Sequence, residues 1–434
     1  MSHPVVIPRS EHIISRAAIS DNALKVLYRL KDSGFKAYLV GGCVRDLMLG
    51  REPKDFDVAT DALPEQVEHL FKNCRLIGRR FRLAHIHFKG EIIEVATFRG
   101  SHNGDEKGGE IQAGRIVRDN VFGSIEEDAV RRDFSVNALY YNIDDFSVVD
   151  YLGGVDDLKN GVLRLIGDPA VRYREDPVRM LRAVRFISKL GFRPHPDSEA
   201  PLFKLGGLLE DISPSRLFDE MLKLFLSGSA VQNFELLRHY DLFAHLFPYT
   251  DKALEEQRNN FPQMLLINAL ANTDLRLEQG KPVTPAFLFA AFLWPALQME
   301  TANLIQNGMT EAQAIQTVAR KLIQKQSQCV SLPRRFSIVT REIWALQPRL
   351  KRNKGKRALA VLKHQRFRAA YDFLLLRTQA GEDYQALVDW WTQIQEQDEG
   401  EQHKMCRAKN HQRKKHSRRR KPPKKIAPPF GSPS

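Results

Sequence analysis

The chain has 434 residues, of which 43% are hydrophobic, so it is long enough for more than one domain with its own core. No apolar run approaches the roughly 18 residues of a membrane span, and the N-terminus lacks the apolar stretch of a secretion signal. The four cysteines lie far apart, without the spacing of a zinc site or a disulfide framework. These features predict a soluble, cytoplasmic protein.

The net charge of +14 is concentrated at the C-terminus. From Gln402 onward the chain has twelve Lys and Arg residues and no Asp or Glu, which leaves 54 basic and 52 acidic residues for the remainder. A segment of one charge sign, rich in Pro and Ser, cannot bury apolar surface, so we predict a disordered basic tail over residues 396–434. A solubilising role is the simplest explanation, but the single sign favours sequence-independent attraction to nucleic-acid phosphates.

Two motifs follow each other within a short strand–helix–strand unit, after a predicted flexible arm over residues 1–19. Gly41 and Gly42 leave backbone N–H groups before a helix open to a phosphate. Asp55 and Asp57 alternate along a strand, so they project from one face roughly 6 to 7 Å apart, which suits two carboxylates that share divalent metals. Each motif alone is common, but together they predict metal-assisted phosphoryl or nucleotidyl transfer.

The stretch over residues 39–60 resembles the signature of the nucleotidyltransferase branch that contains CCA-adding enzymes and bacterial poly(A) polymerases. This resemblance implies a nucleotidyltransferase palm in which Asp55 and Asp57 hold two Mg²⁺ ions. It also implies nucleotide contacts from Gly41, Gly42 and Arg45. The later motifs must decide between the two enzyme types.

The segment over residues 76–88 has a strand-like pattern that three arginines and two histidines interrupt. Arg79, Arg80 and Arg82 follow a glycine close to the predicted site, which favours phosphate contacts over solvated edge positions. The Gly-Arg-Arg-Phe-x-x-x-His run, which ends at His85, is similar to one that is characteristic of bacterial poly(A) polymerases. CCA-adding enzymes more often have a Phe-Gly-Thr type of sequence there, so the run favours the poly(A) branch.

Two acidic positions compete for the role of third carboxylate. Glu94 lies in an otherwise apolar strand, where an acid should be paired, metal-bound or solvated. Asp133 belongs to a segment that resembles the family's Arg-Arg-Asp-Phe-Thr-Ile-Asn motif, although ordinary surface pairs are the alternative for its charges. By that resemblance Asp133 completes the acidic set, and Arg132 and Asn137 lie near the sugar and phosphates of the nucleotide. We favour Asp133 and leave Glu94 as the alternative.

The pattern becomes helical from residue 168 onward. Arg179, Arg182 and Arg185 recur every three residues and therefore lie broadly on one side of a helix. A solvated face is the usual explanation for such a row, and contact with triphosphate or base is the alternative. The segment is similar to the family's Glu-Asp-x-x-Arg element, in which the Asp and the Arg hydrogen-bond the incoming base. The resemblance assigns this role to Asp176 and Arg179, with Arg182 as a weaker candidate.

Residues 200–395 alternate amphipathic segments with Pro or Gly breaks, which predicts an all-helical body. Residues 349–368 form a basic patch, with aromatic side chains at Phe367 and Tyr371. Exposed helix positions explain many of these charges, but phosphate contacts plus stacking would suit a single-stranded RNA primer. The phosphate candidates in this patch are Lys351, Arg352, Lys356 and Arg357.

Together these patterns predict an α+β fold with a palm over residues 20–167, a helical neck over 168–230, an all-helical body over 231–395 and the basic tail. The implied activity is template-independent polyadenylation, in which an RNA 3′-hydroxyl attacks the α-phosphate of ATP. A CCA-adding enzyme is the nearest alternative, and a non-catalytic RNA-binding protein is an alternative from another class. RNA 3′ ends and ATP are the implied substrates, and RNA-decay proteins are candidate partners of the tail. The choice between Mg²⁺ and Mn²⁺ and the oligomeric state stay open.

Overall fold

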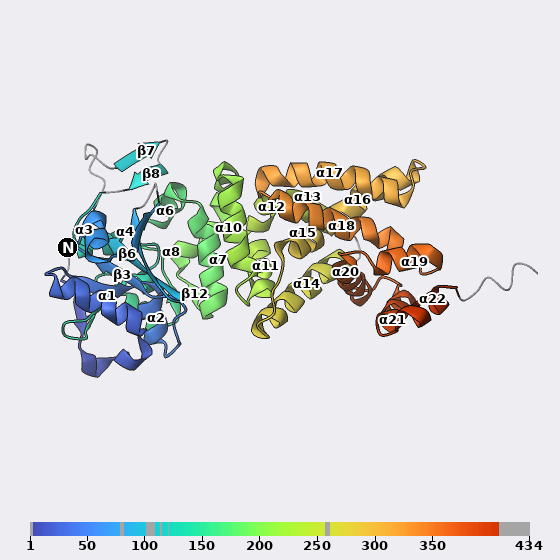
Figure 1. The fold of residues 1–434 in the computed structure, drawn as a ribbon. Coiled ribbons are helices and arrows are strands. Elements are labelled where there is room, and N and C mark those ends of the chain that lie inside the picture. Colours follow the sequence, from blue (N-terminus) through green and yellow to red (C-terminus); the bar gives the residue numbers. More distant parts are fainter. Residues whose placement is uncertain are drawn as a thin grey trace, which may run out of the picture. The chain divides into compact units, whose positions relative to one another are not determined.

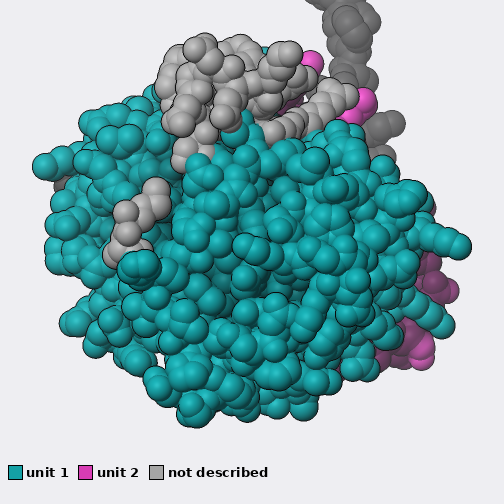
Figure 2. Space-filling model, turned by 90° about the vertical axis from the view of Figure 1, so that its left-hand side faces the viewer, with its two compact units in different colours: residues 1–258, 269–285, 322–333 teal, residues 259–268, 286–321, 334–434 magenta. Residues whose placement is uncertain are grey.

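The computed structural model describes residues 3–78, 82–100, 109–112, 115–119, 121–256 and 261–407 (Figure 1). The chain divides into two compact units (Figure 2). Unit 1 contains residues 1–258, 269–285 and 322–333, and unit 2 contains residues 259–268, 286–321 and 334–434. The chain therefore passes between the units several times, which differs from the consecutive palm, neck and body that we predicted.

Unit 1 contains an eight-stranded mixed sheet. Its strands follow the order β1 (Val5–Ile7), β10 (Val148–Asp150), β9 (Leu139–Asn142), β2 (Ala37–Val40), β3 (Asp57–Thr60), β6 (Glu91–Thr97), β5 (Leu83–Phe88) and β4 (Cys74–Ile77). Only the central pair β3 and β6 is parallel; the other neighbours are antiparallel. Because β3 lies between β2 and β6, the two predicted motifs lie at the middle of the sheet.

Local capping signals mark the bounds of the first helices of the sheet domain. The Ser20 side chain accepts a hydrogen bond from the backbone N–H of Ala23 and caps α1 (Asp21–Asp32). A short α2 (Gly42–Met48) follows β2, as predicted, and Gly50 with φ +69° lies just beyond it. The other elements of this region are α3 (Pro64–Leu70), β7 (Gly109–Gln112), β8 (Arg115–Asp119), α4 (Ile125–Arg131) and α5 (Gly154–Lys159).

The N-terminal arm is the clearest difference from the sequence-based expectation. Within residues 3–19, strand β1 pairs antiparallel with β10, so that Ile7 lies opposite Val148. Ile7, Ile14 and Ile19 are buried, at 8%, 1% and 4% exposure. The prediction of a flexible arm is therefore wrong for this segment, because its isoleucines bury enough apolar surface to hold it against the sheet.

The chain after the sheet is helical, which confirms the predicted α+β fold class. A two-stranded parallel pair, β11 (Val162–Leu163) and β12 (Arg193–Pro194), is the last strand structure in the described residues. The helices are α6 (Pro169–Glu175), α7 (Val178–Leu190), α8 (Pro196–Glu199), α9 (Leu202–Leu205), α10 (Pro214–Phe225), α11 (Ala230–His239), α12 (Leu242–Leu246), α13 (Pro248–Glu256), α14 (Phe261–Glu278), α15 (Pro285–Phe292), α16 (Trp294–Gln306), α17 (Glu311–Cys329), α18 (Arg334–Leu350), α19 (Gly355–Leu362), α20 (Phe367–Gln379), α21 (Gln385–Gln395) and α22 (Glu399–Arg407).

Proline explains most of the breaks between these helices. Pro214, Pro248 and Pro285 are each the first residue of a helix, where a missing N–H costs nothing. Pro348 departs from this rule, because it lies in the last turn of α18 and does not separate two helices. The prediction that Pro and Gly residues break the helical body over residues 200–395 is therefore wrong at this proline.

Unit 2 has an aromatic core and extends into the segment that we assigned to the tail. Trp344 and Trp391 are fully buried, and their indole N–H groups donate to the backbone oxygens of Ala290 and Leu350 at 3.1 and 2.9 Å. Helix α22 ends at Arg407, and its Cys406 is buried. The tail boundary at 396 is thus too early, and residues 408–434 lie outside the described residues. None of the described helices is both long and apolar enough to cross a membrane.

Candidate active site

The glycine turn after β2 brings together groups from three parts of the sheet domain. Gly41 has φ +79°, a conformation that favours glycine, and α2 begins at the next residue. A Cβ atom on Gly41 would lie 3.6 Å from Nη1 of Arg132 and 3.9 Å from Oδ2 of Asp57. The turn therefore lies against both a guanidinium and a carboxylate of the predicted site.

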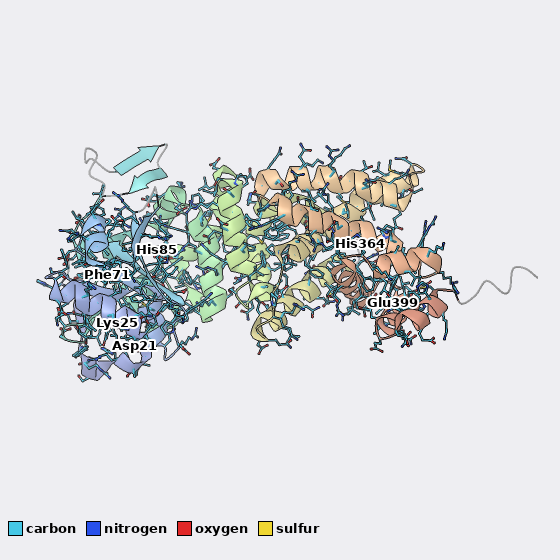
Figure 3. All side chains as sticks on the ribbon, viewed as in Figure 1. Asp21, Lys25, Phe71, His85, His364 and Glu399 are labelled. Atoms are coloured by element: carbon cyan, nitrogen blue, oxygen red, sulfur yellow. The ribbon has the colours of Figure 1, made fainter. Side chains whose placement is uncertain are left out.

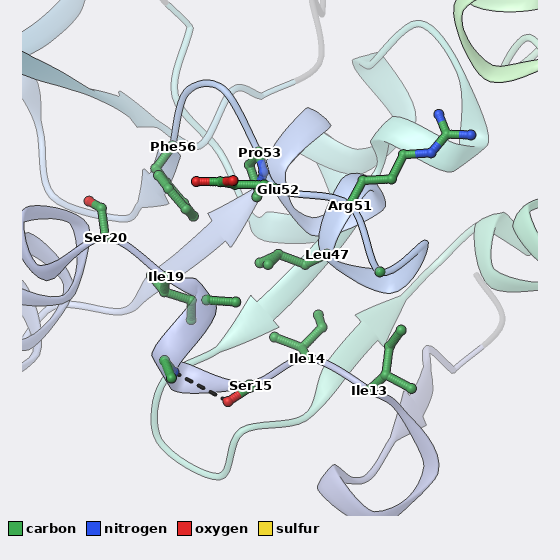
Figure 4. A pocket seen from close by; sticks show the side chains of 13 residues that line it. Ile13, Ile14, Ser15, Ile19, Ser20, Leu47, Arg51, Glu52, Pro53 and Phe56 are labelled. Atoms are coloured by element: carbon green, nitrogen blue, oxygen red, sulfur yellow. Dashed lines mark hydrogen bonds between the residues drawn. The ribbon is translucent and has the colours of Figure 1, made fainter.

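The two aspartates flank a buried phenylalanine at the start of β3. Asp57 is the first residue of the strand, whereas Asp55 is exposed and lies in the bend before it, so only one of them is in the strand as predicted. Phe56 lines a separate cavity of about 540 Å³ with Leu47 and Ile14 (Figure 4). Phe56 and Val58 are 7% and 0% exposed, so these alternate side chains are buried.

Asp57 lines a small polar pocket in the middle of the sheet. The cavity measures about 220 Å³, and its lining also includes Glu94, Asp128 and Arg132. Burial raises the pKa of Asp57 to about 6, with further contributions from Glu94 and Asp55 that Arg132 opposes. The pocket lining thus mixes carboxylates with the arginines Arg99, Arg131 and Arg132, and Asp57 and Glu94 are its two neighbouring acids that could face a cation.

Glu94 is the neighbour of Asp57 in the sheet register. The two residues face each other across β3 and β6, and Glu94 in turn faces His85 across β6 and β5. Nε2 of His85, which Figure 3 labels, lies 3.4 Å from Oε1 of Glu94, so the histidine contacts this carboxylate. Nevertheless, no group of three His, Cys, Asp or Glu side chains in the described part of the chain is placed to hold a metal ion.

The arginines of the Gly-Arg-Arg-Phe run are only partly placed. Arg79 and Arg80 lie outside the described residues. Nη1 of Arg82 contacts Oε1 of Glu65 at 2.5 Å on the surface. Their predicted phosphate contacts therefore stay predictions.

Arg132 lies at the C-terminal end of α4 and is held from one side. Its Nε and Nη2 donate to Oδ2 of Asp128 at 3.1 and 2.9 Å, and Nε also donates to the Tyr140 hydroxyl at 3.0 Å. The Tyr140 hydroxyl itself donates to the same Asp128 oxygen at 2.7 Å. Nη1 forms no hydrogen bond with any residue that the structure describes, and it is the atom that lies beside Gly41.

Asp133 belongs to a different network from the acids around Asp57. Nε and Nη2 of Arg182 donate to its Oδ2 at 2.8 and 2.5 Å, and Asn137 donates to its Oδ1 at 3.1 Å. Burial alone would raise the pKa of Asp133, but the Arg182 guanidinium and these hydrogen bonds outweigh burial and lower the pKa to about 2. The preferred third carboxylate is thus an arginine partner, and Glu94 is the acid beside Asp57.

Arg45, in α2, joins this network through Asn137. Its Nη1 donates to Oδ1 of Asn137 at 2.6 Å, and its Nε donates to Asp46 at 2.8 Å. Only 2% of Arg45 is exposed. Arg45 therefore connects α2 to the Asp133 segment, and little of its guanidinium is accessible to a ligand.

The residues assigned to base recognition lie at the junction between α6 and α7. Oδ2 of Asp176 accepts from Nη2 of Arg216 at 2.7 Å, while its buried Oδ1 has no partner among the described residues. Arg179, on the first turn of α7, donates to the backbone oxygen of Arg172 and to Glu175 at 2.8 and 3.1 Å. The two candidates are thus adjacent, and the buried Oδ1 of Asp176 has unused hydrogen-bonding capacity.

Phe186 is a site residue that sequence reasoning missed. The guanidinium carbons of Arg45, Arg182 and Arg185 lie 5.3, 5.7 and 4.7 Å from the centre of its ring. The ring therefore lies within cation–π distance of all three guanidinium groups and brings them close together. The four-residue interval from Arg182 to Phe186 on one helix was the available signal.

The basic patch of unit 2 is only partly open to a ligand. Arg352, Lys356 and Arg357 are exposed, whereas Nζ of Lys351 lies 2.7 Å from Glu311. Phe367 and Tyr371 are 7% and 6% exposed and belong to the core around Trp391, so they are not free to stack on bases. The prediction of a stacking surface from these two side chains is wrong.

Comparisons with known proteins agree with the motifs. Family models match residues 37–164 ("Poly A polymerase head domain"), 191–254 ("Probable RNA and SrmB- binding site of polymerase A") and 307–425 ("Polymerase A arginine-rich C-terminus"). Poly(A) polymerase I of Escherichia coli O6:H1 is 51% identical over 90% of this chain and 85% of its own length. Poly(A) polymerase I of Haemophilus influenzae is 45% identical over 90% of this chain and 88% of its own length.

CCA-adding enzymes are more distant relatives. The Geobacillus stearothermophilus enzyme is 39% identical over 52% of this chain and 54% of its own length. A crystal structure of the Bacillus stearothermophilus CCA-adding enzyme with CTP has a TM-score of 0.57 and 26% identity, covering 86% of this chain and 80% of that one. The Gly-Arg-Arg-Phe run therefore selected the correct branch. The chain belongs to the poly(A) polymerase family, the polynucleotide adenylyltransferases that extend RNA without a template.

Proposed function

We propose that Asp55 and Asp57 hold two Mg²⁺ ions for the transfer of AMP from ATP to an RNA 3′-hydroxyl. When bound, such ions activate the attacking hydroxyl and neutralise the departing pyrophosphate. The donor set fits, because carboxylate oxygens are the ligands that Mg²⁺ prefers, and the raised pKa of Asp57 reflects first its burial and then the neighbouring carboxylates of Glu94 and Asp55. The partly buried carboxylate of Asp57, with these two acids close to it, is the observation that carries the proposal.

The other two acids take separate roles in this proposal. Glu94 lies beside Asp57 in the sheet and supplies additional negative charge to the cation site. Asp133 assists from the neighbouring network, where it fixes the guanidinium of Arg182. Arg45 and Asn137 connect that network to α2, so they position the arginines that face the nucleotide.

The nucleotide would be held by groups that have free hydrogen-bonding capacity. Nη1 of Arg132, beside Gly41, is directed to where a phosphate oxygen could bind, and Gly42 begins the following helix. The free Oδ1 of Asp176 can accept from the exocyclic amino group of adenine, and Arg179 can donate to a ring nitrogen. Selection of adenine by these two residues is supported by the resemblance noted above.

RNA would be bound by the basic surfaces in a sequence-independent way. Arg352, Lys356 and Arg357 are exposed and lie in a segment without acidic residues from 343 to 371. The basic tail would add to this attraction and is our proposed contact for RNA-decay proteins. We place the reaction in the cytoplasm, where RNA 3′ ends and ATP are available.

Asp55→Asn and Asp57→Asn test the metal-binding role. Each keeps the side-chain shape but removes a charge, so we expect AMP incorporation to fall by at least about a hundredfold, because the cations lose a ligand that acts in the transition state. Incorporation is measured on an unstructured RNA with ATP and Mg²⁺, and again with Mn²⁺. Asp61→Asn is the matched control, since Asp61 lies beyond the other end of β3 and accepts from the Lys36 N–H. Activity of both site variants at the parental level would refute the assignment.

Nucleotide selectivity tests the enzyme type. The purified protein is given ATP or CTP together with either an unstructured RNA or a tRNA that lacks its 3′ end. We expect long A tails on the unstructured RNA and no C incorporation on the tRNA. C incorporation on the truncated tRNA would support the CCA-adding alternative instead.

A further inference from the structure

Asp128 and Tyr140 form a buried clamp on one side of the Arg132 guanidinium. Asp128 is 5% exposed and Tyr140 is fully buried, and both bond to Nε of Arg132 as well as to each other. Burial alone would raise the pKa of Asp128, but Arg132 and Tyr140 outweigh burial and lower it, so the clamp contains a carboxylate. Oδ1 of Asp128 also accepts from the Arg99 N–H at 3.2 Å, just after β6, so both of its oxygens are used.

The clamp leaves one edge of the guanidinium facing the cation pocket. Nη1 of Arg132 and Oδ2 of Asp57 lie on the same side of Gly41, at 3.6 and 3.9 Å from the position of a Cβ. The arginine acts on Asp57 electrostatically, yet its ion pair is with Asp128, at 2.9 Å between Nη2 and Oδ2. A guanidinium released from Asp128 would find the Asp57 carboxylate as its next anionic neighbour.

We propose that Asp128 and Tyr140 are positioning residues that keep Arg132 directed at the phosphates of bound ATP and away from Asp57. This inference rests on the proposed role of Arg132 as a phosphate ligand. Bidentate contact with Asp128 fixes the plane of the guanidinium, and the Tyr140 hydroxyl removes the remaining freedom at Nε. The free edge is then preorganised for an anion, while Asp57 stays available to a cation.

Tyr140→Phe is the most selective test of the clamp. It removes only the hydroxyl and retains the ring, over which the Arg132 guanidinium carbon lies at 5.3 Å. We expect the KM for ATP to rise about fivefold to tenfold, the effect of losing one hydrogen bond of ordinary strength, with a smaller change in kcat. We also expect the Mg²⁺ concentration for half-maximal activity to rise, because Arg132 then competes for Asp57. A residue with only a structural role would not change these two parameters together.

Tyr141→Phe is the matched control. Tyr141 is the next residue of β9, is equally buried, and faces the opposite side of the sheet, where His12 contacts its ring at 6.1 Å. We expect parental values of both parameters for this variant. Asp128→Asn should show the Tyr140→Phe effects in stronger form, and thermal unfolding measured in parallel shows whether that variant is folded at the assay temperature.

Arg132→Lys separates this inference from the proposed function. If Arg132→Lys raises the KM for ATP but Tyr140→Phe and folded Asp128→Asn do not, then Arg132 is a phosphate ligand that needs no clamp, and the inference is overturned. If Arg132→Lys itself leaves the KM for ATP unchanged, then the phosphate role of Arg132 fails, and the inference fails with it. Elevated values in all three variants, with Tyr141→Phe unchanged, support both.

Discussion

Asp133, a residue of the candidate active site, should make the stability of the fold depend on pH in the acidic range. Its folded-state pKa of about 2 lies below the ordinary value of 3.8, because Arg182 and two further donors stabilise the ionised form against burial. A lowered pKa contributes stability above the unfolded-state value that is lost as the pH falls toward the folded-state value. Between about pH 5 and pH 3, this single group should therefore cost the fold about 1 kcal/mol.

Asp133→Asn should remove that component of the pH dependence. The variant is less stable overall because Arg182 loses its partner, so the informative quantity is the slope of unfolding free energy against pH, measured by urea denaturation. We expect a shallower slope than in the parent between about pH 5 and pH 3. Asp32→Asn removes an exposed carboxylate at the end of α1 and should leave the slope unchanged. Equal slopes for parent and Asp133→Asn would contradict the paired arrangement.

At this scale the sequence predicted which residues matter better than what each contacts. Gly41, Asp57 and Arg132 were singled out by spacing and resemblance, and they do lie together. Several other contacts of the site were not predictable, because they join distant positions of the chain. Asn137 contacts Arg45 across 92 residues, and Arg182 contacts Asp133 across 49. Only the folded sheet and α7 bring such pairs together. Tyr140 carried no signal of its role, because it lies in β9 whereas Arg132 lies at the end of α4, and the only signal for Phe186 was its four-residue interval from Arg182.

At the scale of elements, the sheet edge near the N-terminus offers a test of the corrected arm. Ile7 is 8% exposed in β1, whereas Val5 is 62% exposed in the same strand. Ile7→Ala should therefore cost about 2 kcal/mol of unfolding free energy through lost burial, and Val5→Ala should change it by less than about 0.5 kcal/mol. Urea denaturation of both variants measures this contrast. A neutral Ile7→Ala would mean that β1 does not form in solution, as the flexible-arm prediction required.

The elements that sequence patterns predicted well are those with local signals. Ser20 caps α1, and prolines start α10, α13 and α15, because caps and first-turn prolines act within a few residues. Strand β1 has no such signal, since its three residues are stabilised by the partner strand β10. Pro348 shows that a local signal can also mislead, because α18 continues through this proline in its final turn.

For the whole molecule, composition and motif order predicted the fold class but not the division into units. Helix α14 has residues 261–268 in unit 2 and the remainder in unit 1, and α17 is divided in the same way at residue 321. Units of this kind are defined by contacts between segments far apart in sequence, for which helical periodicity gives no information. The charge distribution, in contrast, is a property that the sequence states directly.

Removal of the tail tests what that charge does. Ten of the 66 basic residues and none of the 52 acidic residues lie after Arg407, so deletion of residues 408–434 lowers the net charge from +14 to +4. Fewer cations release fewer counterions from RNA, so we expect a higher KM for RNA and a weaker dependence of RNA affinity on salt, with the logarithmic slope reduced by up to about 7. At saturating RNA kcat should stay within about twofold of the parent, because the tail contributes to encounter and not to chemistry.

Steady-state kinetics and filter binding at several salt concentrations measure these quantities, and a variant with the tail sequence scrambled is the control. The scrambled tail should restore parental values, since attraction to phosphates depends on charge and not on residue order; if it behaves like the deletion, the tail acts through a specific motif.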